Sequence, residues 1–330
     1  MALLETTERG LYCAAGDFFI DPWRAVDRAL ITHAHSDHAR PGSASYLCAE
    51  PGVALLRERL GKRPAISTCR YGETIGLNGV TVSFHPAGHV LGSAQIRVEH
   101  RGEVWVASGD YKATADPTCA PFEPVRCHTF VTESTFGLPI YRWAEATAVF
   151  DEINRWWRRN REQGRTSVLY SYSLGKAQRL LAGIDAGIGP ILMHEAAVKL
   201  TEHYRAAGVA LPEIETLNEE TARAARGKGL LIMPPDAEAV ARLADEGEVS
   251  TAFASGWMLV RRMRRQGADR GFVLSDHADW DELIAAIRAT GAERVLVTHG
   301  YAATLARWLR ENGWQADTLE AQFEGEAENA

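Results

Sequence analysis

Three histidines and an aspartate fall within the six residues His33-Ala34-His35-Ser36-Asp37-His38. The preceding residues 29–32 are apolar or β-branched and predict a buried strand. The first two histidines, two positions apart, point to the same side of an extended segment. The adjacent aspartate and last histidine diverge if the chain turns there. This pattern favours two metal ions side by side at the end of a rigid strand, and the alternative is a surface histidine tract or a run of hydrogen-bonded core histidines.

Length and composition are those of a globular protein of roughly two domains. The chain has 330 residues, of which 46% are hydrophobic and 24% charged. We see no apolar stretch of membrane-spanning length and no signal-peptide layout at the start, so no membrane association is expected. The five cysteines are scattered and are never spaced as Cys-x-x-Cys. Reduced thiols and a cytoplasmic location are therefore expected.

The net charge of −7 argues against a protein that coats nucleic acid by bulk electrostatics. The positive charge is nevertheless clustered, with five arginines in 155–165 and five in 261–270. Each cluster is either a solvated helix face or part of a path for a polyanion.

The periodicity of the chain changes twice. Short strands and turns dominate to about residue 135, and helical spacing of apolar residues follows over 145–162. Strand-like segments at 167–170 and 230–233 then alternate with helical stretches around 176–183, 195–207 and 236–246. This is the alternation of an α/β domain. Strands expected at 272–274 and 294–298 return to the first pattern, which indicates nested domains.

Four further positions carry ligand-type side chains at the ends of predicted strands or in glycine-rich turns. They are His89, Asp110, His277 and His299. A lone histidine at one of these places would more often be structural. Four such residues beside the 33–38 cluster make a shared site the better interpretation, with the Asp110 carboxylate able to bridge two cations.

The motif at 33–38 resembles the signature of the metallo-β-lactamase fold. The later residues resemble its β-CASP nuclease branch: Glu133 lies in Val131–Gly137, His277 in Ser275–Asp279 and His299 in Val297–Gly300. The resemblance implies an αββα sandwich over 1–140 and 271–330, with an inserted α/β β-CASP domain over 141–270. The segment Leu11–Pro22 is most similar to bacterial DNA-ligase-associated exonucleases.

The resemblance also implies residue roles. One metal would be held by His33, His35 and His89, and the second by Asp37, His38 and His299, with Asp110 bridging. Zn²⁺ suits these ligands best and Mn²⁺ is acceptable. Asp21 matches a family aspartate that orients the ligands, and Asp17 and Asp27 fit that place less well. The catalytic residues would be Asp37, Glu133 and His277, with His277, paired to Glu133, protonating the leaving 3′ oxygen.

The segment Tyr170–Lys176 resembles a Ser-x-Gly-Lys element of DNA-processing β-CASP enzymes. Ser171, Ser173 and Lys176 would receive a terminal phosphate at a helix N-terminus. The alternative is ordinary helix capping by Ser173.

The substrate expected is DNA, digested from the 5′ end by a metal-dependent exonuclease in DNA repair. The close likeness to the ligase-associated group favours this and implies a functional association with a DNA ligase and a helicase. One departure speaks for RNA, because a histidine at position 299 is typical of RNA-processing members. Two further hypotheses are a small-molecule hydrolase of the glyoxalase II kind and a non-enzymatic partner subunit. The long insert argues against the hydrolase, and the intact ligand set argues against the partner subunit.

Overall fold

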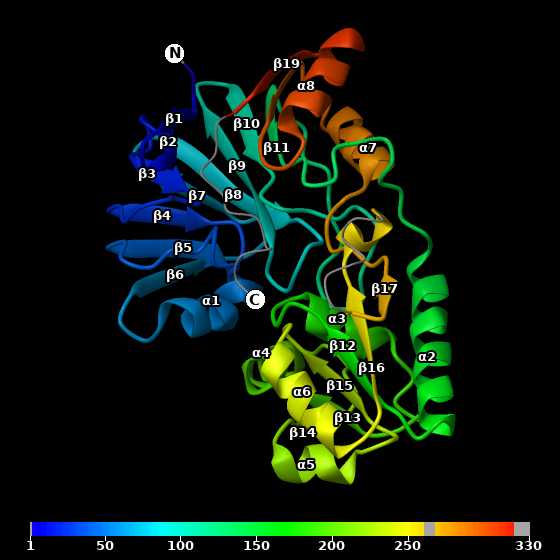
Figure 1. Ribbon diagram of the computed structural model, residues 1–330. Helices are drawn as coiled ribbons and strands as arrows, with labels where there is room; N and C mark the ends of the chain where they lie inside the picture. Colours follow the sequence, from blue (N-terminus) through cyan, green and yellow to red (C-terminus); the bar gives the residue numbers. More distant parts are fainter. Residues whose placement is uncertain (1, 261–267, 320–330) are drawn as a thin grey trace. The chain divides into compact units, whose positions relative to one another are not determined.

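The computed structural model describes residues 2–260 and 268–319 (Figure 1). The chain divides into two compact units. The first contains the described residues up to Arg142 and from His277 onward, and the second runs from Trp143 to Asp276. The chain thus leaves the first unit once and returns to it once.

The first unit contains a sheet of six strands in sequence order, here called sheet A. Its first three strands pair antiparallel, and the remaining pairs are parallel. The strands are β1 (Glu5–Thr7), β2 (Gly10–Cys13), β3 (Phe18–Ile20), β4 (Arg28–Ile31), β5 (Ser45–Ala49) and β6 (Ala65–Cys69). A short 3-10 turn η1 (Glu50–Gly52) and helix α1 (Val53–Leu60) connect β5 to β6.

A second sheet of the same unit, sheet B, has seven strands in the order β19-β18-β11-β10-β9-β8-β7. Strands β7 to β10 form an antiparallel meander, and β10, β11, β18 and β19 are parallel neighbours. The bounds are β7 (Thr74–Leu77), β8 (Val80–Pro86), β9 (Ala94–His100), β10 (Glu103–Ala107), β11 (Thr129–Thr132), β18 (Arg294–Val297) and β19 (Gln315–Thr318).

Two hydrophobic cores hold this unit together. Leu30 and Leu47 of sheet A pack with Val82 and Ile96 of sheet B, so the two sheets face each other. The opposite face of sheet B carries residues such as Phe130, which pack with helices α7 (Trp280–Thr290) and α8 (Ala302–Glu311). Figure 1 shows both helices on the side of the sheet where β11 and β19 lie. The alternation of buried residues along each strand supplies both cores.

The strand directions bring several loops to one edge of sheet B. Strands β8 and β10 run the same way because each is antiparallel to β9, and β11 and β18 are parallel to β10. The carboxyl ends of these four strands therefore share one edge. The segments that follow them contain His89, Asp110, Glu133 and His299, which are four of the ligand-type residues singled out from the sequence.

The second unit is built on an all-parallel sheet in the order β14-β13-β15-β12-β16-β17. Its strands are β12 (Thr166–Tyr170), β13 (Ile191–Met193), β14 (Glu215–Thr216), β15 (Leu230–Met233), β16 (Val249–Ala254) and β17 (Arg270–Phe272). Its helical segments are α2 (Ala146–Glu162), α3 (Lys176–Gly183), α4 (Glu195–Ala206), α5 (Glu219–Ala224), α6 (Ala237–Glu246) and the 3-10 turn η2 (Gly256–Leu259).

Both faces of this parallel sheet are covered, as its apolar strands require. In β12, Leu169 packs with Trp157 of α2 and Leu180 of α3. The alternate residue Val168 faces the other way and packs in the cluster that includes Leu243 of α6. Trp157 is fully buried in this core.

The predicted α/β class is confirmed, and the two facing sheets are compatible with the predicted sandwich. One strand prediction needs correction. A strand was expected over 272–274, but β17 ends at Phe272, and Val273 and Leu274 are irregular. The arginine cluster expected at 261–270 lies mostly outside the described residues. Of the helices within 2–260 and 268–319, none combines the length and apolar character needed to cross a membrane.

Candidate metal centre

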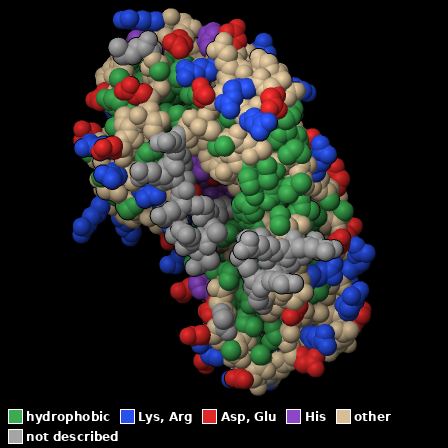
Figure 2. Space-filling view, turned by 45° about the horizontal axis from the view of Figure 1, so that its top comes forward, with side chains coloured by type: hydrophobic (Ala, Val, Ile, Leu, Met, Phe, Trp, Pro, Cys, Tyr) green, Lys and Arg blue, Asp and Glu red, His purple; other side chains and the backbone are tan. Residues whose placement is uncertain are grey.

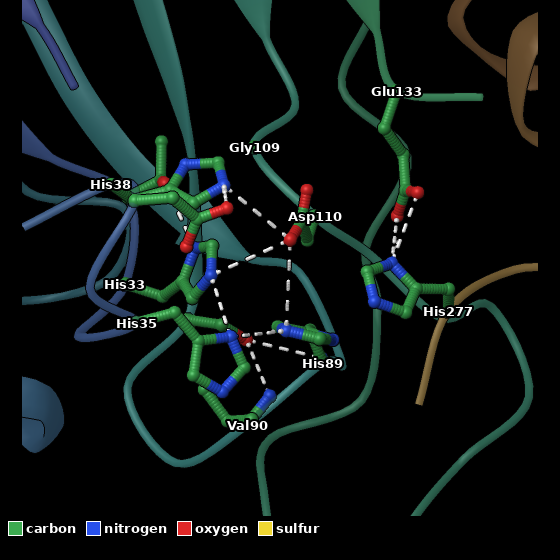
Figure 3. A network of polar contacts seen from close by, with 12 residues as sticks. His33, His35, His38, His89, Val90, Gly109, Asp110, Glu133 and His277 are labelled. Carbon is green, nitrogen blue, oxygen red and sulfur yellow. Dashed lines mark hydrogen bonds and ion pairs between the residues drawn. The ribbon is translucent and has the colours of Figure 1, made fainter. Parts of the chain in front are cut away.

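A first group of four side chains converges directly after β4, β8 and β10. His33, His35, His89 and Asp110 are all buried, and one ligand atom from each lies within 4.8 Å of the others. His35 Nδ1 is 3.0 Å from His33 Nε2 and 3.2 Å from His89 Nε2. Figure 3 shows these rings turned toward one another, with the Asp110 carboxylate beside them.

A second group consists of Asp37, His38 and His299. The His38 and His299 rings stack with their centroids 5.4 Å apart. His38 Nε2 lies 3.7 Å from Asp37 Oδ2 and 3.4 Å from Asp110 Oδ2. The same Asp110 oxygen is 3.5 Å from His33 Nε2, so one carboxylate oxygen stands between the two groups.

Asp21 fixes which nitrogen of two histidines faces the centre. Its carboxylate accepts hydrogen bonds from the Thr32 amide at 2.8 Å, the Thr32 hydroxyl at 2.5 Å and His38 Nδ1 at 2.7 Å. Because the Thr32 hydroxyl has a single proton, which goes to Asp21, its oxygen accepts from His33 Nδ1 at 3.0 Å. Both imidazoles thus carry a proton on Nδ1. Their Nε2 lone pairs are left for the centre, which is the tautomer a metal ligand requires.

A glycine allows β10 to approach the Asp21–Thr32 pair. Gly109 precedes Asp110 and has φ +56°. A Cβ at this position would lie 2.6 Å from Thr32 Cβ, well inside contact distance. Any other residue at 109 would therefore push Asp110 away from the histidines or disturb Thr32.

Burial and mutual charge shift the pKa values of the group in opposite directions. Burial alone disfavours the charged form of His38, but Asp110, Asp37 and Asp21 outweigh it and hold the pKa of His38 well above its ordinary value. Burial likewise opposes ionisation of Asp110, but the charge on His38 holds the pKa of Asp110 well below its usual range. Burial and the charge of His38 keep the pKa of His33 low. Without a cation, the surrounding carboxylates therefore favour a second proton on His38, at the Nε2 position that a metal ion would take.

These residues fit divalent cations. Two nitrogens bound to one Zn²⁺ at 2.0–2.1 Å in tetrahedral geometry stand about 3.3 Å apart. The distances around His35 Nδ1, 3.0 and 3.2 Å, are close to that value. Two facing imidazole nitrogens repel unless a proton or a cation lies between them. A dication would also balance the carboxylates that raise the pKa of His38.

A histidine–glutamate pair lies beside the first group. His277 Nδ1 is 3.0 Å from both carboxylate oxygens of Glu133 (Figure 3). Glu133 follows β11 and is held by the Tyr111 amide, which donates to Oε1 at 2.8 Å. The His277 ring centroid is 4.7 Å from that of His89. Because the carboxylate accepts from Nδ1, the Nε2 atom of His277 is the one available for proton transfer.

The turn that carries His299 is held by the segment after β11. His299 and Gly300 both have left-handed backbone, with φ values of +58° and +54°. The Ser134 hydroxyl donates to the Thr298 carbonyl at 3.0 Å and also to the His299 carbonyl. A Cβ at Gly300 would lie 2.4 Å from the Ser134 carbonyl oxygen. Left-handed backbone at a histidine costs energy, and such conformations cluster at functional sites.

The segment predicted to bind phosphate lies in the second unit, between β12 and α3. Ser171 is buried, and no described residue hydrogen bonds to its hydroxyl oxygen. Ser173 is half-buried. Lys176 is placed differently from the prediction: its Nζ lies 2.9 Å from Asp276 Oδ2 and donates to the Leu274 carbonyl at 2.9 Å. That buried ammonium is held by its own unit, which argues against a direct phosphate contact.

Sequence reasoning missed two polar residues of this region. Thr32 links Asp21 to His33, and Arg179 donates to Asp276 at 3.0 Å. Thr32 ends an apolar run and Arg179 lies in an ordinary helical pattern, so neither carries a local signal. Only their contacts reveal them.

Comparisons with known proteins find several relatives of the chain. The chain is 32% identical over 311 residues, or 93% of its length, to a "Probable DNA ligase" of Opitutus terrae. It is 28% identical over 173 residues, or 51% of its length, to "Endoribonuclease YSH1" of Gibberella zeae. It is 30% identical over 190 residues, or 53%, to "Cleavage and polyadenylation specificity factor 73" of Drosophila melanogaster. These relatives confirm the resemblance to metallo-β-lactamase-fold β-CASP nucleases.

The chain spans only part of these relatives: 30% of the Opitutus protein, 20% of the Gibberella protein and 26% of the Drosophila protein. No family model matches the chain. Among solved structures, a protein of unknown function from Enterococcus faecalis superposes with a TM-score of 0.62 and 12% identity. The superposition covers 90% of this chain and 80% of that one, and it supports the fold alone.

Proposed function

We propose that the protein is a two-metal phosphodiesterase that acts on DNA as an exonuclease. The observation that carries the proposal is the position of Asp110 Oδ2, which lies within 3.5 Å of an Nε2 atom from each of the two ligand groups. A carboxylate shared by two ligand sets is the arrangement expected of a two-metal hydrolase. The second unit would be the β-CASP insert, and the catalytic domain would comprise the segments on either side of it.

Each ligand group would hold one cation, Zn²⁺ in preference to Mn²⁺ because imidazole dominates the donor set. His33, His35 and His89 would hold the first and Asp37, His38 and His299 the second, with Asp110 shared. When bound, two such cations supply a nucleophilic water and stabilise negative charge on a phosphodiester. Asp21 keeps the His38 Nε2 lone pair directed at the centre.

His277 would serve as the general acid. Glu133 accepts from its Nδ1, which orients the ring and leaves Nε2 to donate. As the bond between phosphorus and the 3′ oxygen breaks, the proton on Nε2 passes to that oxygen. The product then leaves as an alcohol rather than as an alkoxide. Proton donation of this kind contributes roughly 10²–10⁴-fold to the rate.

A polyanionic substrate must bind a protein whose overall charge is negative. Lys and Arg side chains are interspersed with Asp and Glu side chains on the face that Figure 2 shows. Local contacts must therefore hold the strand. Arg59 of α1 is one candidate, because its Nε donates to the Ala34 carbonyl within the 33–38 motif at 3.3 Å. Burial lowers the pKa of Arg59, and the charge of Asp37 partly offsets this.

The α3 N-terminus would receive a terminal 5′ phosphate. The Gly175, Lys176 and Ala177 amides of this turn already donate to other groups, so the positive end of the helix dipole would attract the phosphate. The buried Ser171 hydroxyl, which no described residue engages, supports this placement, and Ser173 adds a second hydroxyl. Digestion should then be faster for 5′-phosphorylated than for 5′-hydroxyl strands. Ser171→Ala should remove that preference and leave the metal content unchanged.

An RNA-cleaving nuclease is the second candidate function. Two relatives support it by name, the endoribonuclease and the cleavage and polyadenylation factor, as does His299 in the third motif. DNA is preferred because the relative that spans 93% of the chain is called a probable DNA ligase. A joint role with a ligase and a helicase in DNA repair would follow from that link.

The test compares DNA and RNA strands of one sequence, each labelled separately at the 5′ and 3′ ends, with one metal-loaded preparation. Mononucleotides should be released from the 5′ end of DNA much faster than from RNA. The matched control is His38→Ala, which removes a proposed ligand and should abolish release from both strands. Faster cleavage of RNA by the wild type would favour the second candidate function, and cleavage of neither strand would refute both.

A further inference from the structure

Two cationic side chains of α3 hold the segment that leads into His277. Lys176 and Arg179 are three positions apart, so they project from the same helix face. Lys176 Nζ lies 2.9 Å from Asp276 Oδ2, and Arg179 Nη1 lies 3.0 Å from Asp276 Oδ1. The three side chains are only 4%, 7% and 5% exposed. Asp276 is the last residue of the second unit and is directly bonded to His277.

The same two side chains replace the backbone pairing that this segment lacks. Strand β17 ends at Phe272, and Val273 to Ala278 have no regular structure. Buried carbonyls outside a sheet need other donors. Lys176 donates to the Leu274 carbonyl at 2.9 Å, and Arg179 donates to the Ser275 carbonyl. Three consecutive residues before His277 are therefore anchored by one helix.

We propose that Lys176, Arg179 and Asp276 are positioning residues that set the orientation of the general acid His277. This inference rests on the proposed function. On the other side of His277, the Ala278 amide donates to the Tyr111 carbonyl at 2.7 Å. The irregular backbone around the acid is thus anchored on both sides, and the three positioning residues supply the anchor on the second-unit side.

A role in stability alone explains these residues less well. Burying two cations and a carboxylate carries a large desolvation penalty, and packed apolar residues of similar volume are often equally stable or more so. The hydrogen bonds of Lys176 and Arg179 to the Leu274 and Ser275 carbonyls and to the Asp276 carboxylate, by contrast, are directional. They therefore fix the path of the backbone before His277. A general acid needs a fixed position, because a misplacement of about 1 Å can cost about 10²-fold in rate.

The test uses Asp276→Asn and two phosphodiesters that differ in leaving group. In DNA the leaving 3′ oxygen needs a proton, whereas the nitrophenolate of thymidine 5′-(4-nitrophenyl) phosphate leaves without one. The variant should lose roughly 10-fold to 100-fold in kcat on DNA and less than about 3-fold on the nitrophenyl ester. In a His277→Ala background, Asp276→Asn should cost nothing further on DNA.

The matched control is Asp269→Asn at the other end of β17. Asp269 Oδ2 also accepts a backbone hydrogen bond, from the Thr251 amide at 2.9 Å, but it lies before β17 and is not adjacent to His277. It should leave the ratio of the two activities unchanged. If Asp276→Asn does not fold, Arg179→Lys replaces it, with a smaller loss confined to DNA.

Equal losses on both substrates, or a full additional loss in the His277→Ala background, would overturn the positioning role. A wild-type protein that hydrolyses the nitrophenyl ester but not DNA would instead refute the proposed function. The two failures are therefore distinguishable.

Discussion

Asp21→Asn should weaken metal binding although Asp21 lies outside both ligand groups. The carboxylate accepts three hydrogen bonds, from the Thr32 amide, the Thr32 hydroxyl and His38 Nδ1. An asparagine can keep the amide bond through its oxygen, but its NH₂ group then faces the hydroxyl and the imidazole. Two donors cannot share a bond, so His38 must move its proton to Nε2 or rotate. Either response removes a lone pair from the centre.

The size of the effect follows from these contacts. Loss of an orienting partner of a metal-bound histidine costs roughly 10–100-fold in affinity, which is about 1.4–2.8 kcal/mol. In the metal-free protein, two charge-assisted bonds are weakened at about 1.5 kcal/mol each. Unfolding should therefore become easier by about 3 kcal/mol. The loss of affinity should fall mainly on the cation held by His38.

Competition with a chromophoric chelator measures the affinity, and denaturant titration measures the stability. Asp17→Asn is the matched control, because Asp17 also has left-handed backbone, at φ +52°, and accepts one hydrogen bond from Tyr12 at 2.9 Å, but it is exposed. It should change neither quantity by much. Two equivalents bound by Asp21→Asn with wild-type affinity would refute the tautomer argument.

Three further outcomes are expected. His38→Ala should bind one fewer cation by elemental analysis and lose nuclease activity by orders of magnitude; near wild-type cleavage by the folded variant would contradict the ligand assignment. His277→Ala should keep all its metal but lose roughly 10²–10⁴-fold in kcat on DNA, and loss of a metal equivalent would make His277 a ligand instead. Burial raises the pKa of the Cys48 thiol to about 12. Ionisation of the unfolded chain's thiol therefore leaves stability unchanged below the ordinary thiol pKa and lowers it progressively as the pH rises from there toward 12. Thermal melts from pH 8 to pH 11 should fall less steeply for Cys48→Ala than for the wild type, and parallel curves would refute this.

The candidate metal centre could be predicted from the sequence because the residues proposed as its ligands carry local signals. The 33–38 motif is dense in ligands, and His89, Asp110 and His299 follow strands whose apolar pattern is plain. Parallel strand direction then brings such ends to one edge. The sequence also suggested Asp110 as the bridge, and the structure adds the distances, 3.5 Å from Asp110 Oδ2 to His33 Nε2 and 3.4 Å to His38 Nε2.

The segment from Phe272 to His277 shows why the rest could not be predicted. Its apolar residues favour a strand that continues to Leu274, but β17 ends at Phe272. Side chains of α3 donate hydrogen bonds to the Leu274 and Ser275 carbonyls in place of a neighbouring strand. The same contacts explain the placement of Lys176, which local sequence marks as a phosphate ligand. A lysine at a helix start looks identical in sequence whether its amine faces solvent or a buried aspartate about 100 residues further along the chain.

The most direct test of the two-metal account is reconstitution of chelator-stripped protein with Zn²⁺ or Mn²⁺ while cleavage of end-labelled DNA is followed. Cleavage should be absent from the stripped protein and should reach its plateau at two equivalents per chain. His38→Ala, titrated in parallel, should bind one equivalent and recover no cleavage. Full cleavage by the stripped protein, or a plateau at one equivalent, would contradict the account.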